Sequence, residues 1–262
     1  MMSTRIRAVV APVVFGVAAL VVWQLAVIVL NIQPYVLPGP VNIGTMFGQD
    51  WPTVWAGMLV TGGNALIGFV IGVVLALIAA MISALLRVFD QLTQPLVTVA
   101  SVIPLVALAP VLYTMFDAGA ETSRQLIAAL AVFVPVYLNT LRGLRQVKPV
   151  HRDLMRAYAA TPWQATRTVT LPGALPFIFT GLRIASSLAV ISALISEYFG
   201  GPVDGLATSI TSAAAQSNFT VAYAFVLGAI LLGLVFYCVT LGLEKLATRH
   251  SPLPPERPVV GR

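Results

Sequence analysis

Residues 58–84 read MLVTGGNALIGFVIGVVLALIAAMISA, a run that contains no charged side chain. A membrane-spanning helix needs about 20 predominantly apolar residues, so this run is long enough to cross a bilayer. Its apolar residues follow neither the alternation of a half-buried strand nor the single apolar stripe of a water-exposed helix. The run therefore predicts a helix that faces lipid or other helices on all sides.

Five further stretches have the same character and together occupy most of the chain, at about 8–31, 95–116, 124–142, 177–198 and 221–246. The sequence of 262 residues is 58% hydrophobic and 9% charged, with a mean hydropathy of +0.93. Soluble domains carry about 25% charged residues. The polar segments between the stretches are shorter than the roughly 50 residues of a small domain. We therefore expect an all-α integral membrane protein with six transmembrane helices.

The first stretch resembles a secretory signal peptide at its start, because Arg5 and Arg7 precede it. The apolar region of a signal peptide spans about 7–15 residues and ends at a small-x-small cleavage site. Here the apolar run continues through Trp23 and Gln24 to Leu30. We therefore expect a first helix that is retained and also directs insertion.

The basic residues predict the orientation, because short cytoplasmic loops collect Lys and Arg. Only Arg124 would lie outside, beside Asp117 and Glu121, and the connections at 32–57 and 199–220 contain no Lys or Arg. Arg183, in the first turns of the fifth helix, could extend its side chain towards the inside. With both termini cytoplasmic, the inside carries Arg5, Arg7, Arg87, Arg142, Arg145, Lys148, Arg152, Arg156, Arg167, Lys245, Arg249, Arg257 and Arg262. The net charge of +6 then follows from topology and anionic lipid, with no need for nucleic acid.

The only extended polar connection is the segment at 143–176, which we call the coupling loop. Pro149 is placed to open a helix that runs to Tyr158. Because charge alone would also suit a solvated basic loop with a helix in the headgroup plane, that alternative stays open.

A second, shorter helix is predicted directly after the first. The residues from Thr161 to Gln164 match a capping box, with Thr at the N-cap, Pro at the first helical position and Gln at the third. Leu171-Pro172 and Leu175-Pro176 are predicted to end this helix, because proline disfavours helical geometry in the residue before it. The coupling loop is thus expected to form a helix–turn–helix across the cytoplasmic face.

The spacing in this loop resembles that of the binding-protein-dependent ABC permeases. Their mark is Glu-Ala-Ala, three residues, Gly, nine residues, Ile, one residue, and Leu-Pro. With Leu171-Pro172 as the anchor, Val169 stands at the Ile position, Ala159 at the Gly position and Asp153-Leu154-Met155 at Glu-Ala-Ala. The spacing is kept while the residue types differ. If Gly serves close backbone approach there, Ala159 is the smallest replacement that has a Cβ.

The resemblance covers nearly the whole chain and points to the branch that handles nitrate, sulfonates, taurine and related nutrients. A pattern frequent in that branch, Thr followed three residues later by Arg, is absent, because Thr61 is followed by Asn64. The stretches that carry the resemblance are Leu37–Pro40, Ile103–Pro110, Phe133–Pro135, Leu171–Pro176, Phe179–Arg183 and Ser196–Pro202.

The resemblance implies a type I importer with several components. Two permease subunits would form the pathway, here as a homodimer, two ATPases would bind at the cytoplasmic face, and an external solute-binding protein would deliver the substrate. No phosphate-binding loop is present, so no cofactor is expected on this chain, and ATP and Mg would be bound by the ATPase. The coupling residues implied are Arg152, Asp153, Met155, Arg156, Tyr158, Ala159, Thr161, Leu171 and Pro172. Met155 and Tyr158 would be apolar anchors on one helical face, and Arg152 and Arg156 charge contacts.

Polar side chains inside spans are candidates for the substrate pathway, since intramembrane polar groups are costly and usually functional. The candidates are Asn64, Thr98, Ser101, Ser192, Ser196 and Glu197, with Ser186 and Ser187 as further possibilities. Two alternatives stay open. Glu197 would also serve as a headgroup-level residue that caps a loop or contacts the binding protein, and Ser or Thr would also bond back to helix carbonyls.

Small residues and prolines within the spans predict how the helices pack and bend. Gly68 and Gly72 form a GxxxG pattern, which is typical of close helix packing. Pro104, Pro110 and Pro135 are expected to kink their helices, either as gating hinges or simply to shape the bundle.

The sequence thus predicts a permease subunit of an ATP-driven importer, multi-pass in a bacterial inner membrane, working by alternating access. The solute would be a sulfonate, nitrate, or a vitamin precursor such as a pyrimidine or riboflavin. The alternative is a secondary transporter driven by an ion gradient, which would require ionisable groups at mid-membrane; none is expected here. A third reading is a membrane anchor without transport. An enzyme is not expected, because the only histidines, His151 and His250, lie in polar segments without other catalytic groups.

We expect three parts along the chain. Residues 1–57 would hold the N-terminal tail, the first transmembrane helix and an external loop. Residues 58–246 would form the permease core with the coupling loop, and residues 247–262 a disordered cytoplasmic tail.

Overall fold

The structure is a computed structural model that describes residues 4–116, 119–147 and 149–249. For residues 4–9 and Arg152 it describes the backbone only. Asp117, Lys148 and residues 250–262 lie outside the described residues, so the disorder expected for the C-terminal tail stays a prediction.

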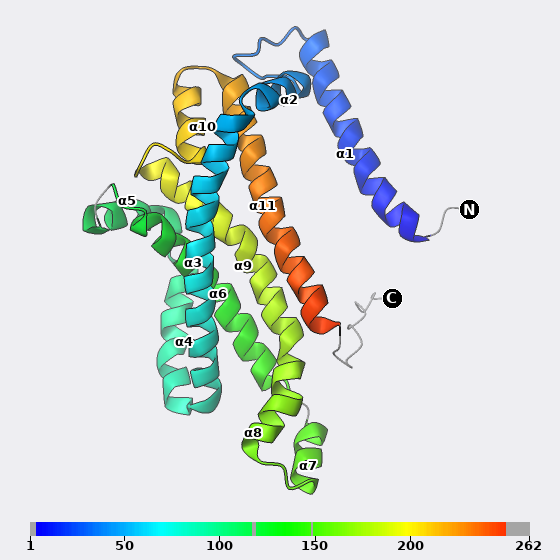
Figure 1. Ribbon diagram of the computed structural model, residues 1–262, viewed down its shortest axis with the longest axis vertical. Coiled ribbons are helices and arrows are strands. Elements are labelled where there is room, and N and C mark those ends of the chain that lie inside the picture. The colour runs from blue at the N-terminus through cyan, green and yellow to red at the C-terminus, as the bar shows by residue number, and fades with distance from the viewer. Residues whose placement is uncertain (1–3, 117–118, 148, 250–262) are drawn as a thin grey trace. The chain divides into compact units, whose positions relative to one another are not determined.

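Every regular element in the described part of the chain is helical, as the sequence predicts (Figure 1). The elements are α1 (Thr4–Val29), α2 (Pro40–Gln49), α3 (Trp51–Leu85), α4 (Arg87–Val102), α5 (Leu105–Phe116), α6 (Thr122–Arg145), α7 (Pro149–Ala157), α8 (Pro162–Ala165), the π-helical segment η1 (Thr166–Thr170), α9 (Leu171–Phe199), α10 (Leu206–Ala215) and α11 (Phe219–Thr248).

Five of the described helical segments are long and apolar enough to cross a membrane: Val10–Val29, Trp51–Leu85, Thr122–Arg145, Pro162–Phe199 and Phe219–Thr248. The pair α4 and α5 supplies a sixth, but the two helices are bent by 99°. Each predicted stretch therefore corresponds to a candidate span.

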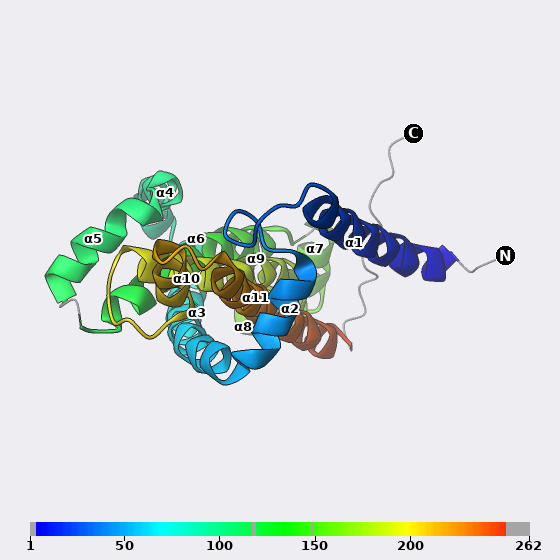
Figure 2. The ribbon, with the colours of Figure 1, turned by 90° about the horizontal axis from the view of Figure 1, so that it is seen from above.

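The third span is sharply bent, which confirms the kink expected at Pro104 and divides the stretch at 95–116 into two helices. The break falls at Ile103, whose φ of −59° and ψ of 124° are extended. This is the conformation that a following proline imposes, and Pro104 follows. Figure 2 shows α5 running away from α4. By contrast, Pro110 and Pro135 lie inside α5 and α6, which continue through them.

The second span begins at Trp51, earlier than the predicted 58, and α2 occupies part of the expected external loop. At 1.5 Å per residue, the 35 residues of α3 extend about 50 Å. The hydrocarbon core is about 30 Å thick. The helix therefore tilts or extends beyond the core, which a hydropathy pattern does not reveal.

The chain divides into two compact units, with boundaries inside α3 and α11. Unit 1 comprises the described residues up to Thr61 together with Val203–Leu231. Within it, the Leu206 N–H donates to Thr61 Oγ1 at 3.0 Å and so satisfies a free amide at the start of α10. A Cβ on Gly228 would lie 2.6 Å from Val54 Cγ1, so α3 and α11 touch there.

Unit 2 comprises Gly62–Pro202 and the described residues from Leu232 onward, and its centre is the packing of α6 against α3 and α9. A Cβ on Gly68 would lie 2.5 Å from Ala128 Cβ, and one on Gly72 would lie 2.5 Å from the Ala129 carbonyl. On the other side of α6, a Cβ on Gly143 would lie 2.8 Å from Phe177 Cβ. The predicted close-packing role of Gly68 and Gly72 is thus confirmed.

Candidate functional site

The coupling loop lies in unit 2, and its first separate helix is α7, which Pro149 opens as predicted. The helix ends in a Schellman motif: the Ala160 N–H donates to the Met155 carbonyl at 3.0 Å, and the Ala159 N–H to the Arg156 carbonyl at 2.9 Å. Ala159 has a φ of +50°, the left-handed conformation for which glycine is preferred. Backbone conformation is therefore a reason for Gly at this position, in addition to the close approach suggested by the sequence.

The predicted capping box at Thr161 is confirmed. The Thr161 N–H donates to Gln164 Oε1 at 2.8 Å, and the Gln164 N–H donates to Thr161 Oγ1 at 3.3 Å. Each side chain thus satisfies a backbone amide of the other residue. The turn between α7 and α8 is fixed by local hydrogen bonds on both sides.

The prediction that Leu171-Pro172 and Leu175-Pro176 end the short helix is wrong. Residues Pro162–Phe199 form one continuous helical run that passes through α8, η1 and α9. In η1 the Leu171 N–H donates to the Thr166 carbonyl, five residues back. This wider turn lies directly before Pro172, at a place where a regular helix would have to accommodate the ring of a proline. The last part of the coupling loop is therefore helical and continues directly into the rest of α9.

The two predicted apolar anchors, Met155 and Tyr158, differ in burial. Met155 is half-buried and lines a cavity of about 190 Å³, whereas the Tyr158 side chain is 73% exposed. A second aromatic residue of the loop, Trp163, is 68% exposed and was not among the predicted coupling residues. The cavity is lined by Leu144, Val147, His151, Met155, Ala165, Val169 and Thr170.

The other predicted coupling residues have varied environments. Asp153 and Arg156 form an exposed ion pair at 3.4 Å, which contributes little stability. Leu171 and Pro172 are half-buried in the continuous helix. The side chain of Arg152 lies outside the described part of the structure.

A second polar site in unit 2 is what we call the Arg124 cluster, formed by Asn64, Glu121, Arg124, Gln125 and Glu197. The Arg124 side chain is fully buried. Its Nη1 donates to Glu121 Oε2 at 3.1 Å and lies 4.0 Å from Glu197 Oε1, while Nη2 donates to the Pro202 carbonyl. A buried arginine is tolerated only with such partners.

Asn64 connects α3 to this cluster. Its Nδ2 donates to Glu121 Oε2, and its Oδ1 accepts from Gln125 Nε2 at 3.0 Å. Glu197 is 1% exposed, so within this chain it faces Arg124 and not open solvent. The sequence made Glu197 a pathway candidate with a headgroup-level role as the alternative; the signal that could have located its partner was Arg124, the one basic residue predicted on that side.

Ser196 and Ser192 are also buried on α9. Ser196 Oγ lies 3.1 Å from the hydroxyl of Tyr113, which comes from α5. A Cβ on Gly201 would lie 2.8 Å from the same hydroxyl, so Tyr113 packs against the turn after α9. These contacts bring Asn64, Ser196 and Glu197 into one region of unit 2.

Thr98 and Ser101 are not part of that region. Both are exposed on α4, and their hydroxyls donate to the carbonyls of Gln94 and Thr98 at 2.8 and 2.7 Å. This is the back-bonding that the sequence reading left open as the alternative. Both residues stay pathway candidates by prediction only.

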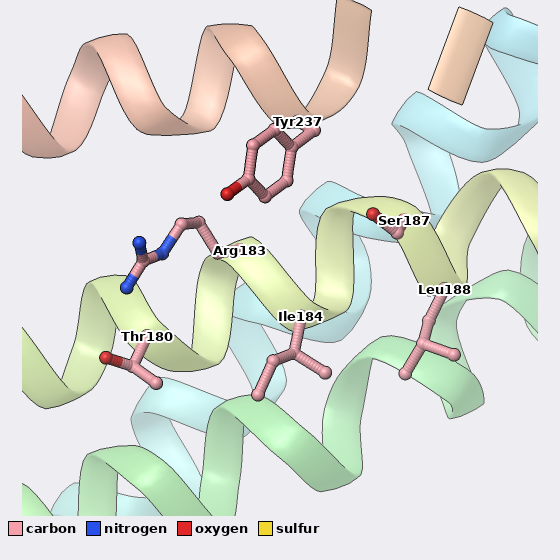
Figure 3. Close-up of a pocket in the computed structure, with 6 residues that line it drawn as sticks. All are labelled: Thr180, Arg183, Ile184, Ser187, Leu188 and Tyr237. Atoms are coloured by element: carbon pink, nitrogen blue, oxygen red, sulfur yellow. The ribbon is translucent and has the colours of Figure 1, made fainter. Parts of the chain in front are cut away.

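A third polar site, which we call the Arg183 hollow, lies between α9 and α11 of unit 2 (Figure 3). It has a volume of about 460 Å³ and is lined by Thr180, Arg183, Ile184, Ser187, Leu188 and Tyr237. Arg183 Nε lies 3.3 Å from Glu244 Oε2. Both residues belong to span-length helices, Arg183 as expected to the fifth predicted span and Glu244 to the C-terminal end of α11.

Comparisons with known proteins agree with this architecture. The family described as "Binding-protein-dependent transport system inner membrane component" matches residues 68–249. A riboflavin transport system permease protein from Chloroflexus aurantiacus is 35% identical over 232 residues, covering 88% of this chain and 86% of the relative. A putative aliphatic sulfonates transport permease protein from Escherichia coli is 34% identical over 190 residues, covering 72% of each chain.

A solved structure of an amino acid ABC transporter has the same fold. It superposes with a TM-score of 0.62 and 17% identity, covering 76% of this chain and 95% of that one. The family match, at residues 68–249, begins within α3 and ends just after α11. It therefore includes the coupling loop and the pairs Arg124–Glu197 and Arg183–Glu244. The chain therefore belongs to the family of binding-protein-dependent transport system inner membrane components, the multi-pass permeases of ABC importers.

Proposed function

We propose that this chain forms half of a solute pathway in an importer powered by a separate ATPase. In this proposal both termini and the coupling loop are cytoplasmic, as the distribution of Lys and Arg predicts. A second copy of the chain completes the pathway, ATP and Mg are bound by the ATPase, and a solute-binding protein delivers a small nutrient from outside. The names of the relatives, one for riboflavin and one for sulfonates, support a small organic nutrient as the solute.

The observation that carries the proposal is the construction of the coupling loop. Its turn is closed by the capping box at Thr161, and it presents Tyr158 and Trp163 to solvent. Exposed aromatic side chains held on a rigid element are suited to anchor a partner protein. Because Pro162–Phe199 is one helical run, a partner that displaces the loop would also displace α9. The ATPase can favour one state of the permease only by fitting it better.

Co-purification of the ATPase tests this proposal. The tagged chain is co-expressed with a candidate ABC ATPase subunit and extracted in mild detergent, and the ATPase recovered with it is quantified. We expect Tyr158→Ala and Trp163→Ala each to weaken ATPase binding by about thirtyfold and so lower the ATPase recovered, since an interfacial aromatic contributes about 2 kcal/mol. ATP-dependent uptake in proteoliposomes should fall in parallel.

The matched control is Tyr35→Ala, which removes another tyrosine that is 63% exposed, in unit 1 and far along the chain from the coupling loop. It should leave ATPase recovery unchanged. If the unmodified chain recovers no ATPase, or if the two loop variants take up solute at the normal ATP-dependent rate, the proposed coupling role is refuted.

A further inference from the structure

The Arg183 hollow is an open depression whose volume lies within the range of small-molecule sites. Sites for small ligands have volumes of about 300–1,000 Å³ and combine mainly apolar walls with a few polar groups. Here the volume is about 460 Å³, Ile184 and Leu188 are apolar, and Thr180, Ser187 and Tyr237 carry hydroxyls. The α9 residues recur three and four positions apart, so they lie on one face of that helix.

Arg183 is held in a way that leaves hydrogen-bond donors available. Its Nε faces Glu244 at 3.3 Å, and its two terminal nitrogens form no hydrogen bond or ion pair with the described residues. The side chain is 32% exposed, and Figure 3 shows the Tyr237 hydroxyl turned towards it. A guanidinium carries its donors in a fixed planar fork, so a ligand with two neighbouring oxygen acceptors would match it.

The charge of the hollow distinguishes two classes of ligand. Glu244 neutralises Arg183, so the pair attracts an additional anion much less than an isolated arginine would. An uncharged ligand with carbonyl oxygens can still accept hydrogen bonds from the guanidinium without repulsion from the Glu244 carboxylate. The ring of Tyr237 and the apolar wall add favourable contact for a flat ring.

We propose that the Arg183 hollow is a binding site for the permeating solute, and that it favours a flat, uncharged ring bearing carbonyl acceptors over an aliphatic oxyanion. Arg183 donates to the carbonyl oxygens, Glu244 orients the guanidinium, and Tyr237 packs against the ring. This assignment rests on the proposed function, and it places solute contact on α9, the helix continuous with the coupling loop.

Binding to the purified chain in nanodiscs tests the site without requiring transport. Riboflavin is the probe, because its ring is flat, uncharged and carries carbonyl groups, and quenching of its fluorescence reports binding. We expect saturable binding that ethanesulfonate does not displace. Arg183→Met and Tyr237→Ala should each weaken it by about tenfold or more, as for loss of a buried polar or aromatic contact of about 1.4 kcal/mol.

The control variant is Arg87→Met, the same substitution at an exposed arginine that does not line the hollow, and it should bind normally. Absence of saturable riboflavin binding, or binding that survives Arg183→Met, overturns the inference. Displacement by ethanesulfonate shows that the site takes oxyanions and overturns the assigned ligand class. ATPase co-purification is measured on the same preparations, so a failed binding site is distinguishable from a failed permease assignment.

Discussion

Two Arg–Glu pairs join helices of unit 2, and they differ in what surrounds them. Arg124 is fully buried, meets Glu121, Glu197 and the Pro202 carbonyl, and joins α6 to the end of α9. Arg183 is 32% exposed, meets Glu244 through one nitrogen, and borders a hollow between α9 and α11. The two terminal nitrogens of Arg124 donate to protein acceptors, whereas those of Arg183 are left for a ligand.

The difference shows that residue type alone does not assign a role to a charge in a membrane span. A charged group in a span is costly in either place, and each arginine is matched with a carboxylate. The role of each pair then depends on its burial. A buried pair with further acceptors holds two helices together, whereas a half-exposed pair beside a cavity can bind a ligand. Removing the arginine of each pair therefore separates stability from binding.

The largest expected effect on stability is that of Arg124→Met. This change leaves Glu197 buried without its cation, and breaking a buried pair in this way costs about 3–5 kcal/mol. The loss of folded protein is measured by size-exclusion chromatography after heating in detergent. Arg183→Met, at a half-exposed pair, should change stability by no more than about 1 kcal/mol.

A second variant keeps this prediction informative if Arg124→Met does not accumulate. Combining Arg124→Met with Glu197→Gln removes both charges, and it should recover much of the lost stability, because an uncharged amide is less costly to bury than a carboxylate. If the single variant is as stable as the unmodified chain, or if the double variant is worse than the single one, the buried pair does not stabilise the junction.

The next effect concerns the helix approach that lets Asn64 reach the Arg124 cluster. Asn64, Gly68 and Gly72 lie four residues apart on one face of α3. A Cβ at Gly68 would lie 2.5 Å from Ala128 Cβ and 2.6 Å from the Gln125 carbonyl, so Gly68→Ala should separate α3 from α6. We expect a loss of about 1–3 kcal/mol in the same heating assay.

Gly63→Ala is the control on the same helix, because a Cβ there would meet nothing within 4 Å. It should be neutral or stabilising by up to about 1 kcal/mol, since alanine favours the helix over glycine. If Gly68→Ala and Gly63→Ala had the same stability in the heating assay, close helix approach at Gly68 would not be what positions Asn64. Both variants should bind riboflavin at the Arg183 hollow normally.

Much of the fold could be predicted from the sequence, because spans depend on long apolar runs and caps on local patterns. The runs located all six candidate spans, and the residues from Thr161 to Gln164 predicted the capping box. A kink at Pro104 was expected but not a bend as large as 99°, and the continuous helix through Pro172 was missed. Both depend on how the backbone absorbs a proline, by an extended residue in one place and by a π turn in the other.

The polar sites were less predictable, because each is built from residues far apart in the chain. The sequence identified Glu197 and Asn64 singly, but their connection through Glu121 and Arg124 needs the packing of three helices. Likewise, Glu244 lies 61 residues after Arg183 (244 − 183), and only the packing of α11 on α9 pairs them. A charge in an apolar run predicts that a partner exists without telling which residue it is.

The smallest expected effect comes from two matched tyrosine variants, one at each pair. Tyr113 is 7% exposed, and its hydroxyl lies 3.1 Å from Ser196 Oγ beside Glu197. Tyr113→Phe should therefore cost about 0.5–1.5 kcal/mol in the heating assay, the usual contribution of one hydrogen bond. Tyr237 is 39% exposed and lines the hollow, so Tyr237→Phe should leave stability unchanged and weaken riboflavin binding only slightly, since the ring is kept. The opposite pattern, with Tyr237→Phe destabilising and Tyr113→Phe neutral, would reverse the roles assigned to the two sites, because the hydroxyl that holds helices together would then be the one beside the hollow.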